Sequence, residues 1–277
     1  MTKIRLHVFD LGRMHMDKSL LVERATVATR DNPHKPAEWV EFPISAFYIE
    51  HANGSVLFDT GCNPNAMGSK GRWPQSFQAT CPYTANEEEQ MLNRLRQIGV
   101  SPDDVKYIVL SHMHNDHAGC IEFFEKSKIF VHDDEFSAAL KLYALHDRSG
   151  PYIWDDTDSW IRKGLNWHLV GKEDGDLPLL DGVKILNLGA GHAYGMLGLH
   201  LTLPKTGGVI LVADAIYCTE NFGPPAQLPG VVYDSIGWRR TVNRIRWLAH
   251  STQSQVWFGH DLKQFKTLIP STQGYYE

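Results

Sequence analysis

The stretch Ser111-His-Met-His-Asn-Asp-His-Ala-Gly119 holds three histidines and one aspartate within six residues, at His112, His114, Asp116 and His117. Packing does not explain this spacing, because imidazoles and a carboxylate are costly to bury together unless a cation holds them. The chain has 14 histidines, so a polar turn with clustered histidines is the alternative. The order His-x-His-x-Asp-His favours a metal site over that alternative.

The residues around this cluster predict a turn between two regular elements. Val105-Lys-Tyr-Ile-Val-Leu110 is a short apolar run rich in β-branched residues, which is typical of a buried strand. The segment 118–124 after the cluster is expected to form a helix. Ligands at positions i and i+2 fit a loop, because on a helix these positions do not share a face.

Three later strand-like segments also end at a residue of a type that binds metals. The segments 183–188, 208–213 and 254–258 run into His192, Asp214 and His260. In layered α/β folds the ends of adjacent strands converge on one edge of the sheets. Taken singly, each residue would be an ordinary turn histidine or strand-end carboxylate, but their joint occurrence favours ligands.

The seven candidate ligands are more than one tetrahedral zinc ion needs. Two divalent ions that share a water use about seven protein ligands, so the sequence predicts a dinuclear site. Asp214 has two carboxylate oxygens and is expected to bridge the ions. The expected division places His112, His114 and His192 on one ion and Asp116, His117 and His260 on the other.

Composition limits the class of protein and its partners. A chain of 277 residues that is 43% hydrophobic can bury a large core, and we expect a single hydrolase domain over residues 1–277. The formal net charge of −5 gives no basic surface for nucleic acid, so no nucleic-acid partner is expected.

The start of the chain and its cysteines indicate where the protein is found. Met1-Thr-Lys-Ile-Arg-Leu-His-Val-Phe9 lacks the apolar core of a signal peptide, and no stretch approaches the length of a membrane span. We therefore expect a soluble, cytoplasmic protein without a membrane partner. Cys62, Cys81, Cys120 and Cys218 are widely spaced, and we expect reduced thiols rather than a disulfide or a structural zinc site.

Apolar periodicity predicts blocks of strands separated by helices. Strands are expected at 3–9, 41–49, 55–59, 105–110, 128–131, 183–188, 196–203, 208–213 and 255–258, and helices at 87–98, 118–124, 133–146, 235–250 and 261–268. Asn86 and Glu89 form the pattern of a capping box. The segment 150–180 matches no element and is interpreted as an insertion near the site. This order predicts two sheets packed face to face with helices outside.

These residues resemble the metallo-β-lactamase superfamily, whose fold is an αββα sandwich with a metal site at one edge of two mixed sheets. The resemblance covers nearly the whole chain and rests on Leu57-Phe-Asp-Thr-Gly61, the histidine cluster, Gly191-His192, Asp214 and Gly259-His260. Within the superfamily the chain is most similar to the N-acyl-homoserine lactone lactonases, which are quorum-quenching enzymes. The segments that carry this closer similarity, besides the histidine cluster, are 71–74, 191–198, 214–217, 222–225 and 271–277.

The resemblance implies a reaction and roles for particular residues. A hydroxide that bridges two divalent metal ions would open the lactone ring, with the hydroxyl of Tyr217 polarising the carbonyl and Asp116 moving a proton. The family's ligands fall on the seven positions inferred above. The ions are expected to be zinc, with cobalt, iron or manganese as alternatives. Without the metal cluster, Tyr217 would be interpreted as a buried core phenol.

Asp59 has two interpretations. It follows the predicted strand 55–59, where its carboxylate could accept a hydrogen bond from a ligand imidazole. It could equally cap the turn at Thr60 and Gly61. The sequence favours neither.

The sequence gives weaker indications of the substrate-binding residues and of the oligomeric state than of the metal ligands. Members of the lactonase group line an acyl-chain channel with apolar residues, for which the candidates here are Met14, Met16, Leu20, Phe47, Met67, Tyr83 and Ile236. Each could instead be core, and as a class they suggest broad acceptance of acyl chains. The group often forms homodimers, and the segment Asp17–Trp39 is a candidate interface arm.

Two other functions remain open from the sequence. The same site could hydrolyse other lactones, esters or phosphotriesters, because a bridging hydroxide does not depend on one kind of carbonyl or phosphoryl centre. The metal could instead be structural, in a protein that binds a partner. A structural site is closed and has no catalytic side chain aimed at a cavity.

Overall fold

Two long antiparallel strands organise the N-terminal half of the protein. The structure is a computed structural model that describes residues 3–277. β1 (Ile4–Asp17) pairs with β2 (Trp39–His51), and the register shifts between Asp10 and Arg13. Gly12 adopts φ +98° at this irregularity, a conformation that favours glycine. β1 therefore continues well past the predicted strand 3–9.

The first sheet has the strand order β4-β1-β2-β3-β5-β6-β7. Its remaining members are β3 (Val56–Phe58), β4 (Tyr83–Thr84), β5 (Tyr107–Val109), β6 (Lys128–His132) and β7 (Asn166–Val170). β3, β5, β6 and β7 run parallel to one another. Their carboxyl ends therefore lie on the same edge of the sheet.

The second sheet has the order β12-β11-β10-β9-β8. Its strands are β8 (Leu177–Leu180), β9 (Val183–Gly189), β10 (Met196–Leu203), β11 (Gly207–Leu211) and β12 (Gln255–Trp257). Only the pair β11 and β12 is parallel. Both sheets are therefore mixed.

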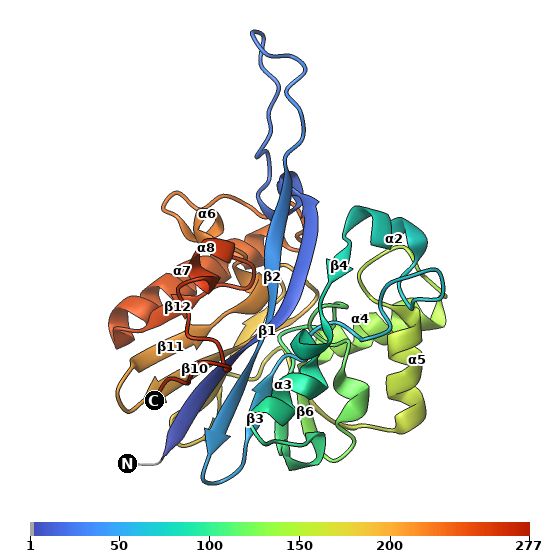
Figure 1. The fold of residues 1–277 in the computed structure, drawn as a ribbon. Coiled ribbons are helices and arrows are strands. Elements are labelled where there is room, and N and C mark those ends of the chain that lie inside the picture. The colour runs from blue at the N-terminus through green and yellow to red at the C-terminus, as the bar shows by residue number, and fades with distance from the viewer. Residues whose placement is uncertain (1–2) are drawn as a thin grey trace.

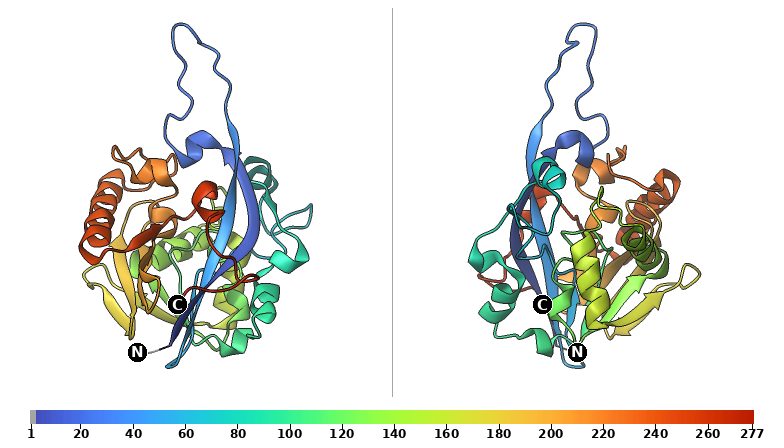
Figure 2. Two further views of the ribbon diagram at one scale, coloured as in Figure 1. Left: turned by 60° about the vertical axis from the view of Figure 1, so that its left-hand side comes forward. Right: turned by 90° about the vertical axis from the view of Figure 1, so that its right-hand side faces the viewer.

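Three apolar layers hold the sandwich together. The layer between the sheets includes Leu6, Val8, Phe58, Leu199 and Leu211. The outer face of the first sheet is covered by α3 (Met91–Gln97), α4 (Asp133–Ala144) and α5 (Trp154–Lys163). α7 (Ser235–Thr252) covers the other sheet through buried residues such as Val242 and Ile245. This arrangement confirms the predicted αββα sandwich (Figures 1 and 2).

The prediction of a helix over 118–124 is wrong. Only a 3₁₀ turn, η3 (Ile121–Phe123), forms there. The carbonyl of His117 accepts hydrogen bonds from the backbone N–H and the hydroxyl of Thr60, and the carbonyl of Gly119 accepts one from the Asn63 amide. These hydrogen bonds fix the segment against the loop after β3, and the backbone continues as a 3₁₀ turn rather than an α-helix.

The helix predicted over 87–98 is interrupted. The capping box of Asn86 and Glu89 is present, but it closes a short 3₁₀ turn, η1 (Glu87–Glu89). Gln90 is extended, with φ −70° and ψ 142°, and α3 begins after it. The helices expected at 133–146 and 235–250 are α4 and α7, and the last helix shortens to α8 (Leu262–Phe265).

The segment 150–180 is not an insertion. It forms α5, β7 and β8, so it contributes one strand to each sheet. The short helices that sequence patterns missed are α1 (Lys18–Leu21), α2 (Gln75–Thr80), η2 (Pro102–Asp104), η4 (Ala213–Ala215) and α6 (Thr219–Phe222). Such short helices carry too few residues for an apolar period to be visible.

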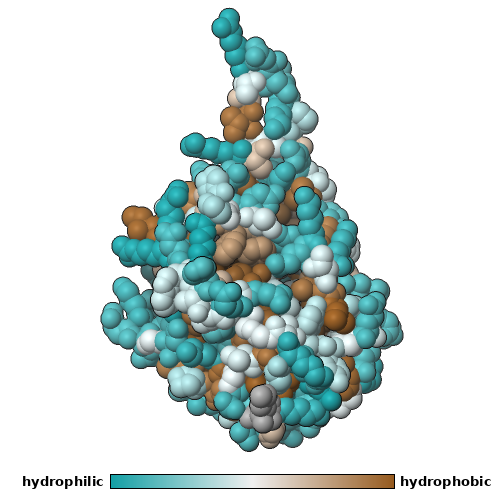
Figure 3. Space-filling model, turned by 90° about the vertical axis from the view of Figure 1, so that its left-hand side faces the viewer, coloured by the Kyte–Doolittle hydropathy of each residue, from teal (hydrophilic) through white to brown (hydrophobic). Residues whose placement is uncertain are grey.

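An arm projects from the body of the molecule between α1 and β2 (Figures 1 and 2). It comprises residues 22–38, and most of them are exposed. Figure 3 shows that the arm is mostly hydrophilic and carries a small hydrophobic patch. Val27 on the arm is 51% exposed, and Trp39 at its base is 57% exposed.

The structure also bears on the cysteines and on membrane association. All four cysteines are free and buried, as expected. Within residues 3–277, no helix has the length and apolar character needed to cross a membrane.

Candidate metal centre

The seven predicted ligands meet at the edge where strands of both sheets end. His112, His114, Asp116 and His117 come from the loop after β5, and His192, Asp214 and His260 follow β9, β11 and β12. All seven side chains are buried. Their ligand atoms form two compact groups, in each of which every atom lies within 4.8 Å of the others. We call His112, His114 and His192 the first half-site and Asp116, His117 and His260 the second half-site.

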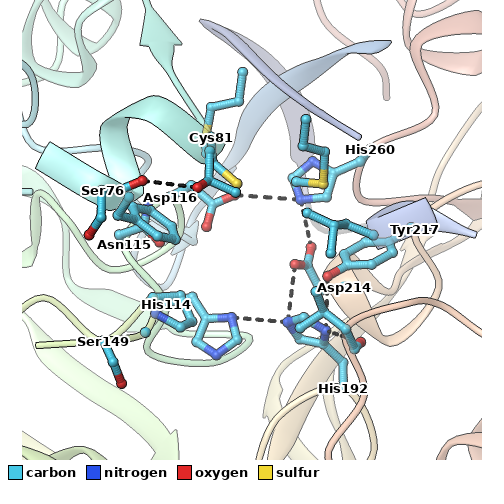
Figure 4. A pocket seen from close by; sticks show the side chains of 18 residues that line it. Ser76, Cys81, His114, Asn115, Asp116, Ser149, His192, Asp214, Tyr217 and His260 are labelled. Carbon is cyan, nitrogen blue, oxygen red and sulfur yellow. Dashed lines mark hydrogen bonds and ion pairs between the residues drawn. The ribbon is translucent and has the colours of Figure 1, made fainter. Parts of the chain in front are cut away.

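Asp214 lies between the half-sites, with one carboxylate oxygen toward each (Figure 4). Its Oδ2 lies 3.4 Å from Nε2 of His192 and 3.7 Å from Nε2 of His112. Its Oδ1 lies 3.1 Å from Nε2 of His117 and 3.0 Å from Nε2 of His260. Ligands about 2.0 Å from a tetrahedral ion lie roughly 3.3 Å from one another. The spacing therefore fits one ion on each side of Asp214.

The other distances within the half-sites agree with this spacing. In the first half-site, Nδ1 of His114 lies 3.0 Å from Nε2 of His192. In the second, Oδ2 of Asp116 lies 3.4 Å from Nε2 of His117 and 3.5 Å from Nε2 of His260.

Hydrogen bonds at the far side of the rings define the tautomers in the second half-site. Nδ1 of His117 lies 2.9 Å from Oδ2 of Asp59, and Nδ1 of His260 lies 3.0 Å from the carbonyl oxygen of Pro43. Both partners are acceptors, so each Nδ1 donates its hydrogen. Nε2 of a neutral ring then presents its lone pair to the centre of the site.

The first half-site follows the same rule. Nδ1 of His192 lies 3.1 Å from the carbonyl oxygen of Val231, and Nδ1 of His112 lies 3.0 Å from the hydroxyl of Ser111. That hydroxyl in turn donates to Oδ2 of Asp59 at 2.8 Å. The Nε2 atoms of His112 and His192 therefore also face the centre as acceptors.

Three buried atoms at the centre have no hydrogen-bond partner within the described residues. They are Nε2 of His112, Nε2 of His117 and Oδ1 of Asp214. Buried polar atoms are almost always satisfied, and unpaired ligand atoms in both half-sites mark places for cations. The donor set of imidazoles and carboxylates suits zinc and similar divalent ions.

Electrostatics differ between the half-sites. Burial, reinforced by neighbouring imidazoles, lowers the pKa of His112 and of His114 well below the usual value, so these rings are neutral. Burial also lowers the pKa of His117, but the carboxylates of Asp214, Asp116 and Asp59 outweigh it and raise that pKa well above the usual value. The second half-site therefore has the stronger demand for positive charge.

Asp59 contacts the second half-site from the side of His117 that faces away from the centre. Its φ is +62°, a left-handed conformation that Asp tolerates better than most residues. The carboxylate accepts hydrogen bonds from the backbone N–H of Ser111 at 2.7 Å, from the Ser111 hydroxyl and from His117. Of the two interpretations, the geometry favours contact with a ligand imidazole over the turn cap.

Glu135 is a buried carboxylate that sequence reasoning missed. It lies in the first turn of α4, and its exposure is 0%. It accepts hydrogen bonds from the backbone of Met113 and Tyr194 and from the hydroxyl of Tyr152. Burial raises its pKa to about 7. An acidic residue in the first turn of a helix is so common that the sequence carried no distinguishing signal.

A cavity of about 340 Å³ opens onto the cluster (Figure 4). Met14, Met16 and Leu20, which are candidates for the acyl-chain channel, line this cavity, and so do Asp116 and Tyr217. Further lining residues that the sequence did not indicate are Phe77, Thr80, Cys81, Ser149, Pro151 and Val231. Their elements reach the site only through the tertiary fold, so no local pattern marked them.

Four residues predicted for the acyl-chain channel do not line this cavity. Phe47 is buried between the sheets against Phe58, because its position on β2 points inward. Tyr83 is buried and donates its hydroxyl hydrogen to the carbonyl of Leu11 at 2.7 Å. Met67 packs against the core, and Ile236 is 62% exposed.

Tyr217 lies in the cavity wall with its hydroxyl 3.0 Å from Nδ1 of His192. That nitrogen carries its only hydrogen when Nε2 is a ligand, so it has no lone pair to accept from the phenol. The hydrogen is shared between the carbonyl of Val231 and the phenol oxygen, and His192 does not use the phenol hydrogen. Burial and the charges of Asp214 and Asp116 raise the pKa of Tyr217 well above its usual value. The phenol is therefore a neutral donor beside the cluster.

The fold and the cluster define a class of protein, a metal-dependent hydrolase with an αββα sandwich and its site at one edge of the two sheets. A model of the metallo-beta-lactamase superfamily matches residues 39–244. The chain belongs to the metallo-beta-lactamase superfamily.

Within this superfamily the chain is similar to several N-acyl homoserine lactonases. The chain is 46% identical over 273 residues to N-acyl homoserine lactonase AiiB of Agrobacterium fabrum, which covers 99% of both proteins. It is similar in structure to an N-acyl homoserine lactone hydrolase with the product N-hexanoyl-L-homoserine bound at the catalytic metal centre, with a TM-score of 0.82 and 26% identity over 100% of both chains. The same values apply to a mutant of Bacillus thuringiensis AiiA with N-decanoyl-L-homoserine bound at the active site.

Proposed function

We propose that this protein opens the lactone ring of N-acyl-L-homoserine lactones by hydrolysis and releases the N-acyl homoserine, which is quorum quenching. The observation that carries the proposal is the shared cavity, in which the buried cluster around Asp214 and the Tyr217 hydroxyl face an apolar wall. The relative AiiB, 46% identical over nearly its whole length, is an N-acyl homoserine lactonase.

The two half-sites would each hold one divalent ion, with Asp214 shared between them. When bound, such ions supply Lewis acidity and lower the pKa of water, so that hydroxide is available near neutral pH. Zinc suits the mixed nitrogen and oxygen donors best, and cobalt, iron or manganese would also fit them. Metal analysis of protein purified without added metal identifies the ions, and fewer than two ions per chain after loading with zinc would contradict the proposal.

Tyr217 would act on the carbonyl group of the lactone. Its free phenol hydrogen can donate to the carbonyl oxygen as negative charge develops there. Because its pKa is raised, the phenol remains a neutral donor over the whole working pH range. The hydroxyl of Tyr217 lies in the same cavity wall as Met14, Met16 and Leu20.

Asp116 would move the proton. Its Oδ2 faces the second half-site, and the residue also lines the cavity. Although burial raises its pKa, the charge of His117 lowers it below the usual value, so the carboxylate is ionised and can accept a proton. It would take the proton from the attacking water and return it to the ring oxygen that leaves the carbonyl carbon.

The apolar wall would bind the acyl chain. Methionine adapts to ligands of different length, and Met14 and Met16 lie beside Leu20 at the cavity. Structurally similar hydrolases have been observed with both hexanoyl and decanoyl homoserine. We therefore propose broad acceptance of acyl chains, which similar kcat/KM values for short and long chains would support and a sharp optimum would contradict.

A single assay separates this function from its alternatives. Lactone opening is followed by pH change across a panel of acyl lengths, with a δ-lactone and a phosphotriester as comparators. N-acyl homoserine lactones should give the highest kcat/KM. A faster phosphotriester or δ-lactone would shift the function to another hydrolase, and no activity in the metal-loaded protein would leave a structural metal site.

We further propose that the protein is a homodimer joined through the arm of residues 22–38. The arm extends away from its own domain, and Val27 and Trp39 expose large apolar side chains there. Light scattering at micromolar concentration should show twice the monomer mass, and Trp39→Glu should reduce it. A monomeric wild type would contradict this assembly. The cytoplasmic location stays a prediction.

A further inference from the structure

Glu135 collects hydrogen bonds from three separate segments of the chain. Oε1 accepts from the backbone N–H of Met113 at 2.9 Å and from the Tyr152 hydroxyl at 2.9 Å. Oε2 accepts from the backbone N–H groups of Tyr194 at 3.0 Å and Gly195 at 3.3 Å. Each oxygen therefore has two donors, and the carboxylate is completely buried among them.

These donors adjoin the ligands of the first half-site. Met113 lies between His112 and His114 in the chain, and Tyr194 follows His192 by two residues. Two loops that are about 80 residues apart in the sequence are thus tied to one side chain. Backbone bonds on both sides of a carboxylate hold such loops at a defined separation.

Tyr152 adds a link to a ligand ring. Its ring packs edge-on against the ring of His114, with centroids 4.7 Å apart and an interplanar angle of 84°. The hydroxyl of Tyr152 is held by Glu135. The orientation of His114, which has its Nδ1 toward His192, therefore depends partly on the same carboxylate.

We propose that Glu135 is a positioning residue that sets the separation and orientation of His114 and His192, and so the metal affinity of the first half-site. The inference rests on the proposed metal centre. The hydrogen bonds of Glu135 within the described residues go to Met113, Tyr152, Tyr194 and Gly195, and none goes to the second half-site, whose His117 is oriented by Asp59. Asp59 also reaches His112 through the Ser111 hydroxyl, whereas Glu135 is the carboxylate that holds the backbone beside His114 and His192.

The cost of burying the Glu135 carboxylate supports this positioning role. Burying a carboxylate is costly unless hydrogen bonds satisfy it, and the described residues show no Arg or Lys paired with Glu135. Asp156, another fully buried carboxylate, pairs with Arg72 at 2.8 Å. Glu135 instead relies on four donors, three of them backbone groups beside the proposed ligands.

The test compares two buried carboxylates. Glu135→Gln keeps the shape of the side chain, but its amide nitrogen cannot accept, so one pair of donors loses its partner. Asp156→Asn is the matched control, because it removes a buried carboxylate that lines neither the cavity nor the cluster. Zinc affinity is measured for both variants and for wild type by competition with a chromophoric chelator, together with the absorption spectrum of the cobalt-loaded proteins.

The expected result is selective for one ion. Glu135→Gln should bind one of two ions about 10–100-fold more weakly, which is the usual effect of losing a partner behind a ligand. The cobalt spectrum should change for that ion alone. Asp156→Asn should lower the melting temperature and leave both affinities unchanged. Equal weakening of both ions, or unchanged affinities in a folded Glu135→Gln, would overturn the proposal.

Two further outcomes are distinguishable. If Glu135→Gln does not fold, Tyr152→Phe removes only one of the four hydrogen bonds and should weaken the same ion by a smaller factor. Unchanged affinity in that variant would then overturn the proposal. If wild type itself fails to bind two ions, the proposed metal centre is wrong, whatever the variants show.

Discussion

The two halves of the candidate centre are held by different means. In the second half-site, Asp59 contacts the ligand itself, 2.9 Å from Nδ1 of His117. In the first, Glu135 contacts the backbone around the ligands and the hydroxyl of Tyr152. A carboxylate beside a ligand tunes its charge and tautomer, whereas a carboxylate behind the backbone sets only its position.

The two half-sites also differ in the charge of their histidines. Asp59, Asp116 and Asp214 together raise the pKa of His117, while the rings of His112 and His114 are neutral because burial lowers theirs. The second half-site is thus the more anionic and the first the more dependent on geometry. Variants that change charge and variants that change position should therefore affect the two halves differently.

The largest effect is expected at the residue that joins the halves. Asp214→Asn keeps the volume but leaves only one carbonyl oxygen, so at most one half-site retains its shared ligand. We expect kcat/KM to fall by more than the ~10³-fold that loss of a single oxyanion donor costs. Metal content and lactone opening are measured together. Two retained ions with near-normal activity would show that Asp214 is no bridge.

The next largest effect should leave both half-sites intact. Tyr217→Phe removes a donor from the cavity but no ligand, so kcat should fall by about 10²–10³-fold while metal content stays at the wild-type level. The proposed acyl-chain wall is made by other residues, so KM should change little. Steady-state kinetics and metal analysis decide this. A purely structural phenol would lower the melting temperature without a selective loss of kcat.

Asp59→Asn sharpens the contrast between the halves. The amide is compatible with the positive φ of this residue, so the backbone can stay in place. The partner of His117 loses its charge, and we expect about 10–100-fold weaker binding of the ion in the second half-site. Chelator competition reports this. The same loss in the first half-site would mean that the two halves are not held independently.

The smallest effect concerns a carboxylate outside both halves. Burial raises the pKa of Asp156 to about 7 from an unfolded value of 3.8, although Arg72 opposes the shift. The folded protein thus binds an extra proton between these values, and this contribution to stability is lost as pH rises from about 4 to about 7.

Asp156→Asn removes that titration. The free energy of unfolding of wild type relative to the variant should fall by on the order of 2 kcal/mol between pH 5 and about pH 8, well below the full linkage value for a shift of this size. Denaturant unfolding at several pH values measures the difference, in which the contributions of all other groups cancel. A pH-independent difference would show that Asp156 is ionised throughout.

Local patterns predicted the convergence of the candidate ligands and much of the fold. His112 to His117 follow one apolar run, and His192, Asp214 and His260 each follow another. A strand end is a local feature, and parallel strand ends share an edge, so the convergence of these residues could be inferred. The prediction of a helix at 118–124 was wrong for the opposite reason, because Thr60 and Asn63 from a distant loop hydrogen-bond to this segment and hold it in another conformation.

The cavity could be predicted only in part. Met14 and Met16 were found at its wall, whereas Phe47 and Tyr83 turned inward to the core. All four are apolar residues in strands, and the sequence does not say which face of a strand meets a cavity. Cys81 and Ser149 reach the wall from loops whose course depends on the elements that they join.

The sequence by itself determined the chemistry of this protein, because ligand-type residues at strand ends are set by short-range order along the chain. Only the tertiary structure decided how that chemistry is held. Glu135 and Asp59 act through hydrogen bonds to segments far away in the sequence, and the free energy of burying a carboxylate depends on donors that the fold alone brings together.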